Sequence, residues 1–281
     1  MKFVEFQDLK EKYDVINIGS GPSKNDFDWS VITEVDGYNF AVAPEDFRYD
    51  ARIVKNYGKY VNKGGAVVIV ICPLSFAENA YLQEDFFSYK YVKALPPEDV
   101  DIPLWKYFIL KIPLLGICII NARRAINIPC HVINHFVKKR KIELPCEEKL
   151  VYGWLRDNPC LKNLKDIPDV NLSEIFERKV SDLRNVVKEC RSHSLIPIFL
   201  LPPVSKKLKS FFSEDFLDLF VYKNIGSVDD TITLLDYMQN EQFNDDNYFS
   251  NGLFLKKEYV QLFTRDVLKR INIFLNRGIN T

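Results

Sequence analysis

Histidine and paired cysteine are scarce in this sequence, and their scarcity restricts the chemistry that it can carry. Three histidines occur in 281 residues, and none follows His193. The six cysteines are scattered without a Cys-x-x-Cys pair, so the paired ligands typical of a zinc site are missing. We therefore expect no metal and no cofactor, and we expect the thiols to be reduced.

Net charge and long apolar runs are lacking too. Lysine plus arginine and aspartate plus glutamate number 38 each, so the chain lacks the basic excess of nucleic-acid binders. The N-terminus has no apolar core of a secretion signal. The most apolar stretch, residues 107–120, is broken by Lys111, Pro113 and Gly116 and falls short of the roughly 20 apolar residues that cross a bilayer. The sequence thus predicts a cytoplasmic protein that has no transmembrane segment and binds no nucleic acid.

Internal repeats and Gly/Ser-rich linkers are absent, which favours a single domain over residues 1–281. Apolar residues make up 47% of the chain, enough for a sizeable core. Within this domain, residues 77–170 are rich in aromatic side chains and repeatedly interrupted by proline. We predict that they form a helical insertion.

Short apolar runs separated by amphipathic segments determine the expected fold. The run at residues 66–71 is uninterrupted and rich in β-branched residues, as in a strand covered on both faces. The predicted strands cover residues 15–18, 38–42, 66–71, 196–201 and 231–235, and the predicted helices cover residues 44–60, 171–193, 205–220 and 256–276. This order predicts an α/β fold, a three-layer sandwich with a central parallel sheet.

The first predicted strand ends abruptly in the small residues Gly19, Ser20 and Gly21, followed by Pro22. Open α/β sheets bind ligands outside the carboxyl ends of their strands, and small residues let a ligand approach the backbone closely. We therefore expect any site to be built on residues 19–23. The alternative is that the glycines only permit a sharp turn, because the fuller G-x-G-x-x-G fingerprint is absent.

Other polar groups are weaker candidates. His131 and His135 would share a helix face, but the H-E-x-x-H pattern and a third ligand are missing, so we expect ordinary histidines. His193 would suit the dipole at a helix end. The basic run at residues 138–141 is expected to be a solvated helix end.

Acidic and aromatic clusters are also weak candidates for a binding site. Glu241, Asp245 and Asp246 could bind calcium but lack the EF-hand pattern, so we expect a solvated loop. Trp29, Trp105 and Trp154 could stack on sugars, but core packing is the preferred interpretation for each.

Several segments, taken in order, carry a resemblance to a known family. They are residues 17–21 (Asn-Ile-Gly-Ser-Gly), 39–44 (Asn-Phe-Ala-Val-Ala-Pro), 66–76, 196–203 and a C-terminal block over residues 235–264 that includes Asn-Gly-Leu-Phe at 251–254. Together they resemble the SGNH/GDSL hydrolases, and more closely the bacterial branch found among surface-polysaccharide and cell-wall acylation proteins. The resemblance implies a flavodoxin-like sandwich with its active site at the carboxyl edge of the sheet.

The sequence departs from this family at the positions that matter for catalysis. The family's nucleophile falls on Gly21, its aspartate on Asn251 and its histidine on Phe254. The glycine whose N–H helps to form the oxyanion hole falls near Pro44, which has no N–H. A serine hydroxyl needs a neighbouring base to become a nucleophile, so these replacements predict loss of catalysis.

Three functional hypotheses follow. The first is a pseudoenzyme that keeps the cleft for binding or scaffolding a glycan or protein partner in a surface-polysaccharide pathway, with a cleft formed by Gly19, Ser20, Gly21, Pro44, Ser75, Asn251 and Phe254. The second is an active serine esterase or O-acyltransferase for acylated glycans, using Ser20, Ser23 or Ser75 with a histidine from the insertion. The third is an interaction protein that works through the insertion, with residues 104–136 as a surface for homo-oligomers; an exposed apolar patch there would favour it.

Overall fold

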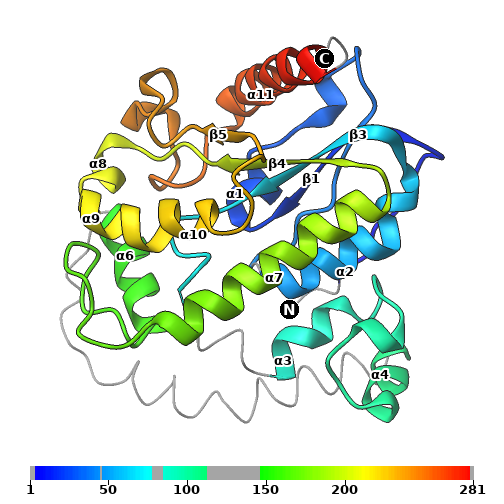
Figure 1. The fold of residues 1–281 in the computed structure, drawn as a ribbon, viewed down its shortest axis with the longest axis horizontal. Helices are drawn as coiled ribbons and strands as arrows, with labels where there is room; N and C mark the ends of the chain where they lie inside the picture. Colours follow the sequence, from blue (N-terminus) through cyan, green and yellow to red (C-terminus); the bar gives the residue numbers. More distant parts are fainter. Residues whose placement is uncertain (1–3, 45, 78–84, 113–145, 279–281) are drawn as a thin grey trace. The chain divides into compact units, whose positions relative to one another are not determined.

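A computed structural model describes residues 4–44, 46–77, 85–112 and 146–278 (Figure 1). The chain divides into two compact units. The first comprises Met1–Gln7 and Ala80–Pro145, and the second comprises Asp8–Asn79 and Cys146–Thr281.

The second unit is organised around a sheet of five parallel strands in the order β2-β1-β3-β4-β5. The strands are β1 (Tyr13–Gly19), β2 (Gly37–Asn39), β3 (Val61–Val70), β4 (Ile196–Leu201) and β5 (Leu234–Asp236). The predicted α/β fold with a central parallel sheet is confirmed. The strand order fits the SGNH-hydrolase and flavodoxin-like arrangement.

The central strand shows why the apolar pattern was informative. Residues 66–71 are all fully buried, because helices cover both faces of β3. At the edge, β2 is shorter than the predicted strand at 38–42. The chain still follows β1 beyond it, since Phe40 N donates to Asn17 O (2.9 Å) and Val42 N donates to Gly19 O (3.2 Å).

The other edge strand, β5, begins at Leu234 rather than at Thr231 as predicted. The Thr231 hydroxyl and backbone N–H both donate to Asp229 Oδ1, at 2.6 and 2.9 Å. This local turn delays the start of the strand, because it holds the backbone in a conformation that cannot join the sheet.

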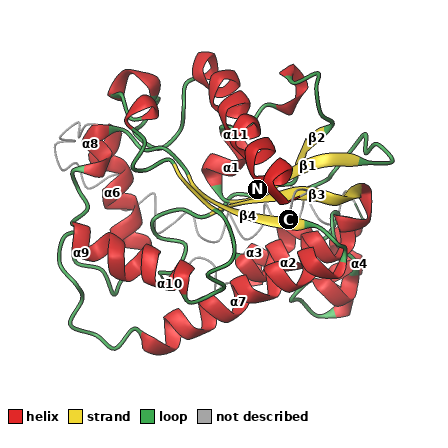
Figure 2. Ribbon diagram, turned by 45° about the horizontal axis from the view of Figure 1, so that its top comes forward, coloured by secondary structure: helices red, strands yellow, loops and turns green. Residues whose placement is uncertain are grey.

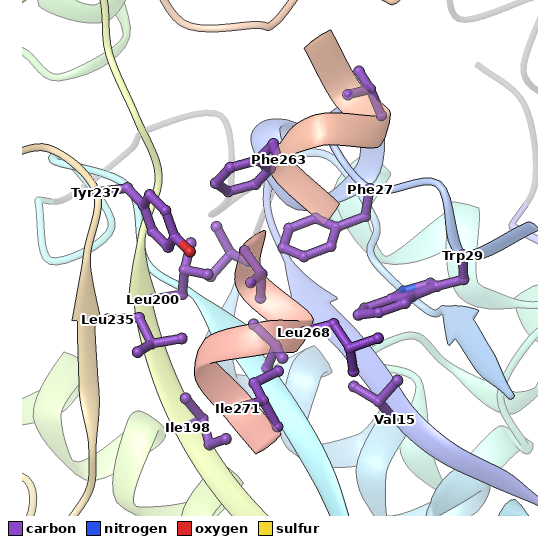
Figure 3. Packing of buried hydrophobic residues seen from close by; sticks show 14 of the residues in the cluster. Val15, Phe27, Trp29, Ile198, Leu200, Leu235, Tyr237, Phe263, Leu268 and Ile271 are labelled. Atoms are coloured by element: carbon purple, nitrogen blue, oxygen red, sulfur yellow. The ribbon is translucent and has the colours of Figure 1, made fainter. Parts of the chain in front are cut away.

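Three long helices complete the layers of the second unit. The helices α2 (Phe47–Tyr57) and α7 (Ser173–Ser192) cover one face of the sheet, and α11 (Lys257–Gly278) covers the other (Figures 1 and 2). On the α11 side, apolar residues of alternating strand positions pack against Phe263, Leu268 and Ile271 (Figure 3). This is the period-two alternation expected of a strand with two covered faces.

Local side-chain hydrogen bonds mark where two of these helices begin. The helix predicted at 44–60 starts only at Phe47, because the Asp46 carboxylate accepts a hydrogen bond from Arg48 N at 3.0 Å. The helix predicted at 171–193 starts at Ser173, whose N–H donates to Asn171 Oδ1 at 3.0 Å. Both helices exist where the sequence placed them, with shorter ends.

The single amphipathic helix predicted at 205–220 is wrong. The chain forms α8 (Lys206–Lys209), α9 (Glu214–Leu217), a π-helical turn η6 (Asp218–Tyr222) and α10 (Lys223–Gly226). Ser213 interrupts the pattern, since its Oγ accepts from Phe216 N at 3.0 Å and donates to Lys165 O at 2.6 Å. A serine that caps a new helix in this way ends the one before it.

Shorter elements connect this framework. In the second unit they are α1 (Gly21–Asn25), η1 (Trp29–Val31), η2 (Gly58–Tyr60), α6 (Cys146–Asp157), η7 (Glu241–Phe243) and η8 (Asp246–Tyr248). In the first unit they are α3 (Asp85–Ser88), η4 (Tyr89–Tyr91), η5 (Pro97–Asp99) and α4 (Leu104–Lys111). Within these described ranges, no helix combines the length and the apolar character needed to cross a membrane.

Several sequence predictions concern the first unit and the tryptophans. Of the segment 104–136, predicted to be largely helical, α4 covers the beginning, and residues 113–136 lie outside the described residues. His131, His135 and the basic run at 138–141 lie outside them too. Trp29 packs in the core as predicted. The prediction of core packing is wrong for Trp105, which is exposed because it lies on the outward face of α4.

Candidate active site at the carboxyl edge of the sheet

The candidate site begins where β1 and β3 end side by side. Gly19 pairs with Val70 at the last position of the two strands, so the segments that follow them leave the sheet at the same edge. The strand order reverses here, because β1 leads to β2 on one side and β3 leads to β4 on the other. In open parallel sheets, this switch point is the usual position of a ligand crevice.

Gly19 is required by this close approach. Its φ is +109°, and a Cβ added to it would overlap the Val70 carbonyl oxygen. Only glycine adopts this backbone conformation without strain and leaves the two strands in contact. Gly19 is therefore needed for the close packing of β1 against β3. This is the structural interpretation of the Gly-x-Gly pattern, in which the glycine serves the backbone and not a ligand.

Two of the predicted site serines meet at a cysteine. Ser20 Oγ lies 2.7 Å from Cys72 Sγ, in a hydrogen bond that either atom could donate. Cys72 N donates to Ser75 Oγ at 2.9 Å, and Ser75 N donates to Cys72 O at 3.0 Å. The Cys72 side chain is half-buried. Sequence reasoning did not assign it a role, although its position directly after the strongest strand was the available signal.

Ser23 is brought to the same turn but is used to build it. Its Oγ donates to Ile18 O at 2.7 Å and accepts from Asn17 Nδ2 at 2.9 Å, and the side chain is fully buried. Asn17 also accepts a hydrogen bond from Trp29 Nε1 at 2.7 Å. These bonds hold β1, α1 and η1 together, so the Ser23 hydroxyl is occupied by structural contacts.

Gly21 and Phe254, which the resemblance paired as nucleophile and base positions, do lie together. A Cβ built on Gly21 would stand 2.8 Å from Phe254 Cε1 and 3.0 Å from Cζ. Carbon atoms at such distances repel, since ordinary contacts between them lie near 3.5–4.0 Å. The aromatic ring therefore fills the space into which a side chain at position 21 would project.

Asn251 is turned back onto its own loop. Its Oδ1 accepts from Leu253 N at 3.2 Å and from Phe254 N at 3.0 Å. The loop closes with a backbone hydrogen bond from Ser250 N to Phe254 O at 2.8 Å. The amide thus fixes the backbone that presents the Phe254 ring, which is a structural role that does not require a charge.

The buried carboxyl group of Asp26 forms a hydrogen bond with the end of this loop. Asp26 Oδ1 accepts from Leu255 N at 3.1 Å, and Oδ2 has no hydrogen-bond partner among the described residues. Burial raises the pKa of the Asp26 carboxyl well above its usual value, against a smaller opposing effect of the bond from Leu255. Asp26 therefore joins the end of α1 to the residue that follows Phe254. Nothing in its sequence neighbourhood pointed to this role.

The remaining predicted cleft residue, Pro44, follows the segment that runs beside Gly19 through the Val42–Gly19 hydrogen bond. It is exposed and is preceded by a cis peptide bond. It supplies no N–H at this point of the chain, as its residue type requires.

Histidine is not supplied to this edge by the described part of the chain. His193 follows α7 and precedes β4, so it lies at the amino edge of the sheet, opposite Ser20. There its Nε2 lies 3.2 Å from Lys55 O, and its ring packs on Gly58. This agrees with the prediction of a histidine at a helix end.

Two acidic side chains of the loop at residues 241–246 also form hydrogen bonds with the backbone. Asp245 Oδ1 accepts from Asn247 N, and Asp246 Oδ1 accepts from Lys207 N, both at 2.9 Å. Within residues 4–44, 46–77, 85–112 and 146–278, no three histidine, cysteine, aspartate or glutamate side chains gather in a way that could hold a metal ion.

Comparison with known proteins gives no family assignment: no protein-family model matches this sequence, and no curated protein matches it significantly. The class is therefore defined by the fold alone, an α/β protein with a five-stranded parallel sheet and a turn of small residues at the β1/β3 switch point.

Proposed function

We propose that this protein is a non-catalytic SGNH-hydrolase-like protein that uses the cleft at the carboxyl edge of its sheet for binding or scaffolding in a surface-polysaccharide pathway. The observation that carries the proposal is the Phe254 ring against Gly21. It occupies the space where the resemblance expects a serine nucleophile and a histidine base to meet.

The chemistry of the neighbouring groups supports this proposal. A serine hydroxyl becomes a nucleophile when a base within about 2.6–3.2 Å takes its proton. The group beside Ser20 is the Cys72 thiol, and His193 lies at the opposite edge of the sheet. Asn251 is uncharged and bonded to its own backbone, so it does not orient a base.

The same groups are suited to binding. The hydroxyls of Ser20 and Ser75 lie on either side of Cys72, and a hydroxyl can both donate and accept hydrogen bonds. Hydroxyl-rich ligands such as glycans are recognised by groups of this kind. The proposed ligand is accordingly a glycan, or a protein that carries one.

Ester hydrolysis tests the catalytic part of the proposal. Wild-type protein and the variants Ser20→Ala, Ser23→Ala and Ser75→Ala are assayed on simple acyl esters and treated with a serine-directed phosphonate. Ser192→Ala, at an exposed helix end, serves as the control. We expect no rate above background and no labelling. A rate that collapses in one of the three variants, with the label on that same serine, would instead establish the esterase or O-acyltransferase alternative.

Ligand-induced stabilisation tests the binding part. A ligand that binds only the folded state raises the stability by RT ln(1 + [L]/Kd), so a bound oligosaccharide raises the melting temperature. Acylated and deacylated oligosaccharides are compared on wild type and on Ser20→Phe, which places a ring in the cleft. A shift that occurs in wild type and is lost in Ser20→Phe supports the proposal, and an equal shift in both places the ligand elsewhere.

The exposed apolar side chains of α4 favour the third hypothesis, an interaction surface in the insertion. Such a surface does not depend on the state of the cleft.

A further inference from the structure

Asp26 holds the base of the loop that carries Phe254. This segment, residues 249–255, is the Phe254 loop, and an antiparallel bridge between its first and last residues closes it at the base. Asp26 Oδ1 accepts a hydrogen bond from Leu255 N at 3.1 Å. Leu255 directly follows Phe254, whose ring lies against Gly21. Asp26 therefore acts at the base of the loop, next to the residue that covers Gly21.

The second oxygen of the Asp26 carboxyl group is buried without a partner. Oδ2 makes no hydrogen bond within the described residues, and the whole side chain is fully buried. Such a position is far less costly for a neutral carboxyl group than for a carboxylate, because an unpaired buried charge loses much more solvation than an unpaired polar group does. The surroundings of Asp26 thus favour the protonated form, in agreement with its raised pKa.

Among the described residues, no charged side chain offsets the cost of ionising Asp26. Its pKa responds first to burial and then to the bond from the loop, and to no nearby charge. The Phe254 loop itself contains no ionisable side chain. The ionisable side chains of the adjacent segments are not buried. They are Lys24 of α1, Asp28 beyond it, and Lys256, Lys257, Glu258 and Tyr259 around the start of α11.

The other side of the loop contacts an ion pair that keeps its charges. Glu147 of α6 packs on Gly252, where an added Cβ would stand 2.8 Å from Glu147 Cγ. Lys207 Nζ lies 2.9 Å from Glu147 Oε2, and this bond lowers the pKa of Glu147 and raises that of Lys207. Both groups therefore stay charged from about pH 5 to pH 8. This side of the loop gives no pH response of its own.

We propose that Asp26 is a pH-sensitive switch for the Phe254 loop: the neutral carboxyl group keeps the loop closed over Gly21, and ionisation releases it. The carboxylate gains solvation only when water reaches Oδ2, so the loop that meets Asp26 through Leu255 has to move. The Phe254 ring then leaves Gly21, and the turn after β1 is uncovered. The switch does not rest on the ligand proposed for the cleft, and the protein alone suffices to test it.

Hydrogen exchange resolved to single amides tests the switch. The amides of Phe254 and Leu255 report on the loop, and those of β3 report on global opening. Rates are measured from about pH 4.5 to pH 7.5 and corrected for the exchange of unstructured peptides at each pH. In wild type, both loop amides should exchange at least tenfold faster than those of β3 at every pH. Their corrected rates should also rise with pH, by up to about tenfold per unit.

Two variants separate Asp26 from other groups. Asp26→Asn still offers an acceptor to Leu255 N but does not ionise, so its loop should show no rise in corrected rate. Asp28→Asn is the matched control, because this neighbouring carboxylate is half-buried and accepts from Ser30 N. Its loop should respond to pH as wild type does.

Three outcomes would overturn the switch. The first is a loop in wild type whose corrected rates do not change with pH, which would show that the carboxyl group ionises in place or not at all. The second is a rise of the same size in Asp26→Asn. The third is loop amides that exchange only as slowly as those of β3, because the loop then opens only with the whole unit. The first and third outcomes need wild type alone, so they decide the matter even if Asp26→Asn does not fold.

Discussion

At the scale of single residues, the candidate site depends on what stands next to Gly21. The residue has an ordinary backbone conformation, and its φ is not in the left-handed region. Its lack of a side chain is needed only because the Phe254 ring lies so close. Gly21 and Phe254 are complementary in size, so the effect of a substitution at one position on stability should depend on the residue at the other.

This complementarity predicts the effect of Gly21→Ala. The new methyl group meets the Phe254 ring, and overpacking of this kind costs about 1–3 kcal/mol. We expect the lower end of that range, because Phe254 is half-buried and its ring can move outward. Urea unfolding of wild type, Gly21→Ala, Phe254→Ala and the double variant measures the coupling between the two positions.

The double variant should recover most of the loss, because Phe254→Ala removes the ring that alanine would meet. Gly153→Ala is the matched control: it lies in α6 with no atom within 4 Å of the added methyl group, and it should gain about 0.5–1 kcal/mol. If Gly21→Ala were as harmless as Gly153→Ala, the Phe254 ring would not fill the space beside Gly21.

Asp26 gives a second prediction at this scale, on the pH dependence of stability. The folded protein holds the Asp26 proton more tightly than the unfolded chain does, since burial raises the pKa well above its usual 3.8. As pH rises above about 4, unfolding releases this proton, and the stability of wild type falls by at most about 1.4 kcal/mol per pH unit. Asp26→Asn removes the titration and still offers Oδ1 to Leu255 N.

The stability of Asp26→Asn relative to wild type should therefore increase from pH 4.5 to pH 7.5. Denaturant unfolding at several pH values measures this difference, and the titrations of other groups cancel in it. A difference that stays constant across the range would mean that Asp26 is ionised in the folded protein.

The residue scale is also where sequence reasoning reached its limit. Gly21 and Phe254, two positions that the resemblance singles out, lie against each other in the structure. Neither Cys72 nor Asp26 was assigned a role. Each owes its role to a contact with a segment distant in sequence, Ser20 for one and Leu255 for the other, and the residues around Cys72 and Asp26 do not identify those partners.

At the scale of elements, predictions succeeded where burial on both faces left a strong pattern. The strand β4 matches the prediction at 196–201, and β3 contains the uninterrupted run that predicted it. The predicted helix at 205–220 failed because its apolar spacing continues through Ser213. The hydroxyl of that serine bonds to Lys165 O, a partner that the sequence alone does not reveal.

The ends of elements were less predictable for the same reason. Asp46 forms a charge-assisted pair with Arg48, in which Nη2 lies 2.6 Å from Oδ2. Burial alone would raise the pKa of the Asp46 carboxyl, but the bonds to Arg48 and the charge of Lys179 lower it overall. The carboxylate therefore remains charged at the start of α2, where the helix dipole favours it. Such a cap moves a boundary by a few residues and leaves the element in place.

At the scale of the whole second unit, one sheet is covered by α11 on one face and by α2 and α7 on the other (Figures 1 and 2). Phe263 of α11 is fully buried and lies 5.3 Å from the Phe27 ring and 4.9 Å from the Tyr237 ring (Figure 3). Cys190 of α7 is buried on the other side. The two side chains can therefore report whether both layers unfold together.

We predict that they do, because every strand of the sheet is shared by both layers. Phe263→Ala should cost about 3–5 kcal/mol by urea unfolding, as expected for a fully buried phenylalanine. Burial raises the pKa of the Cys190 thiol to about 12, so this cysteine should resist alkylation until the unit opens. If one global opening exposes it, Phe263→Ala should speed the labelling of Cys190 by about two to four orders of magnitude, at roughly 1.4 kcal/mol per factor of ten.

The measurement is mass spectrometry of the peptide that contains Cys190, after the cysteines that react in the native protein have been blocked. Leu262→Ala is the control, because this neighbour of Phe263 is exposed and its removal should change neither stability nor labelling by more than about 0.5 kcal/mol. A loss of stability in Phe263→Ala without faster labelling of Cys190 would show that the α11 layer opens alone. The sheet would then keep its α7 layer closed while the other face unfolds, and the loop that carries Phe254, which leads directly into α11, would belong to the less stable layer.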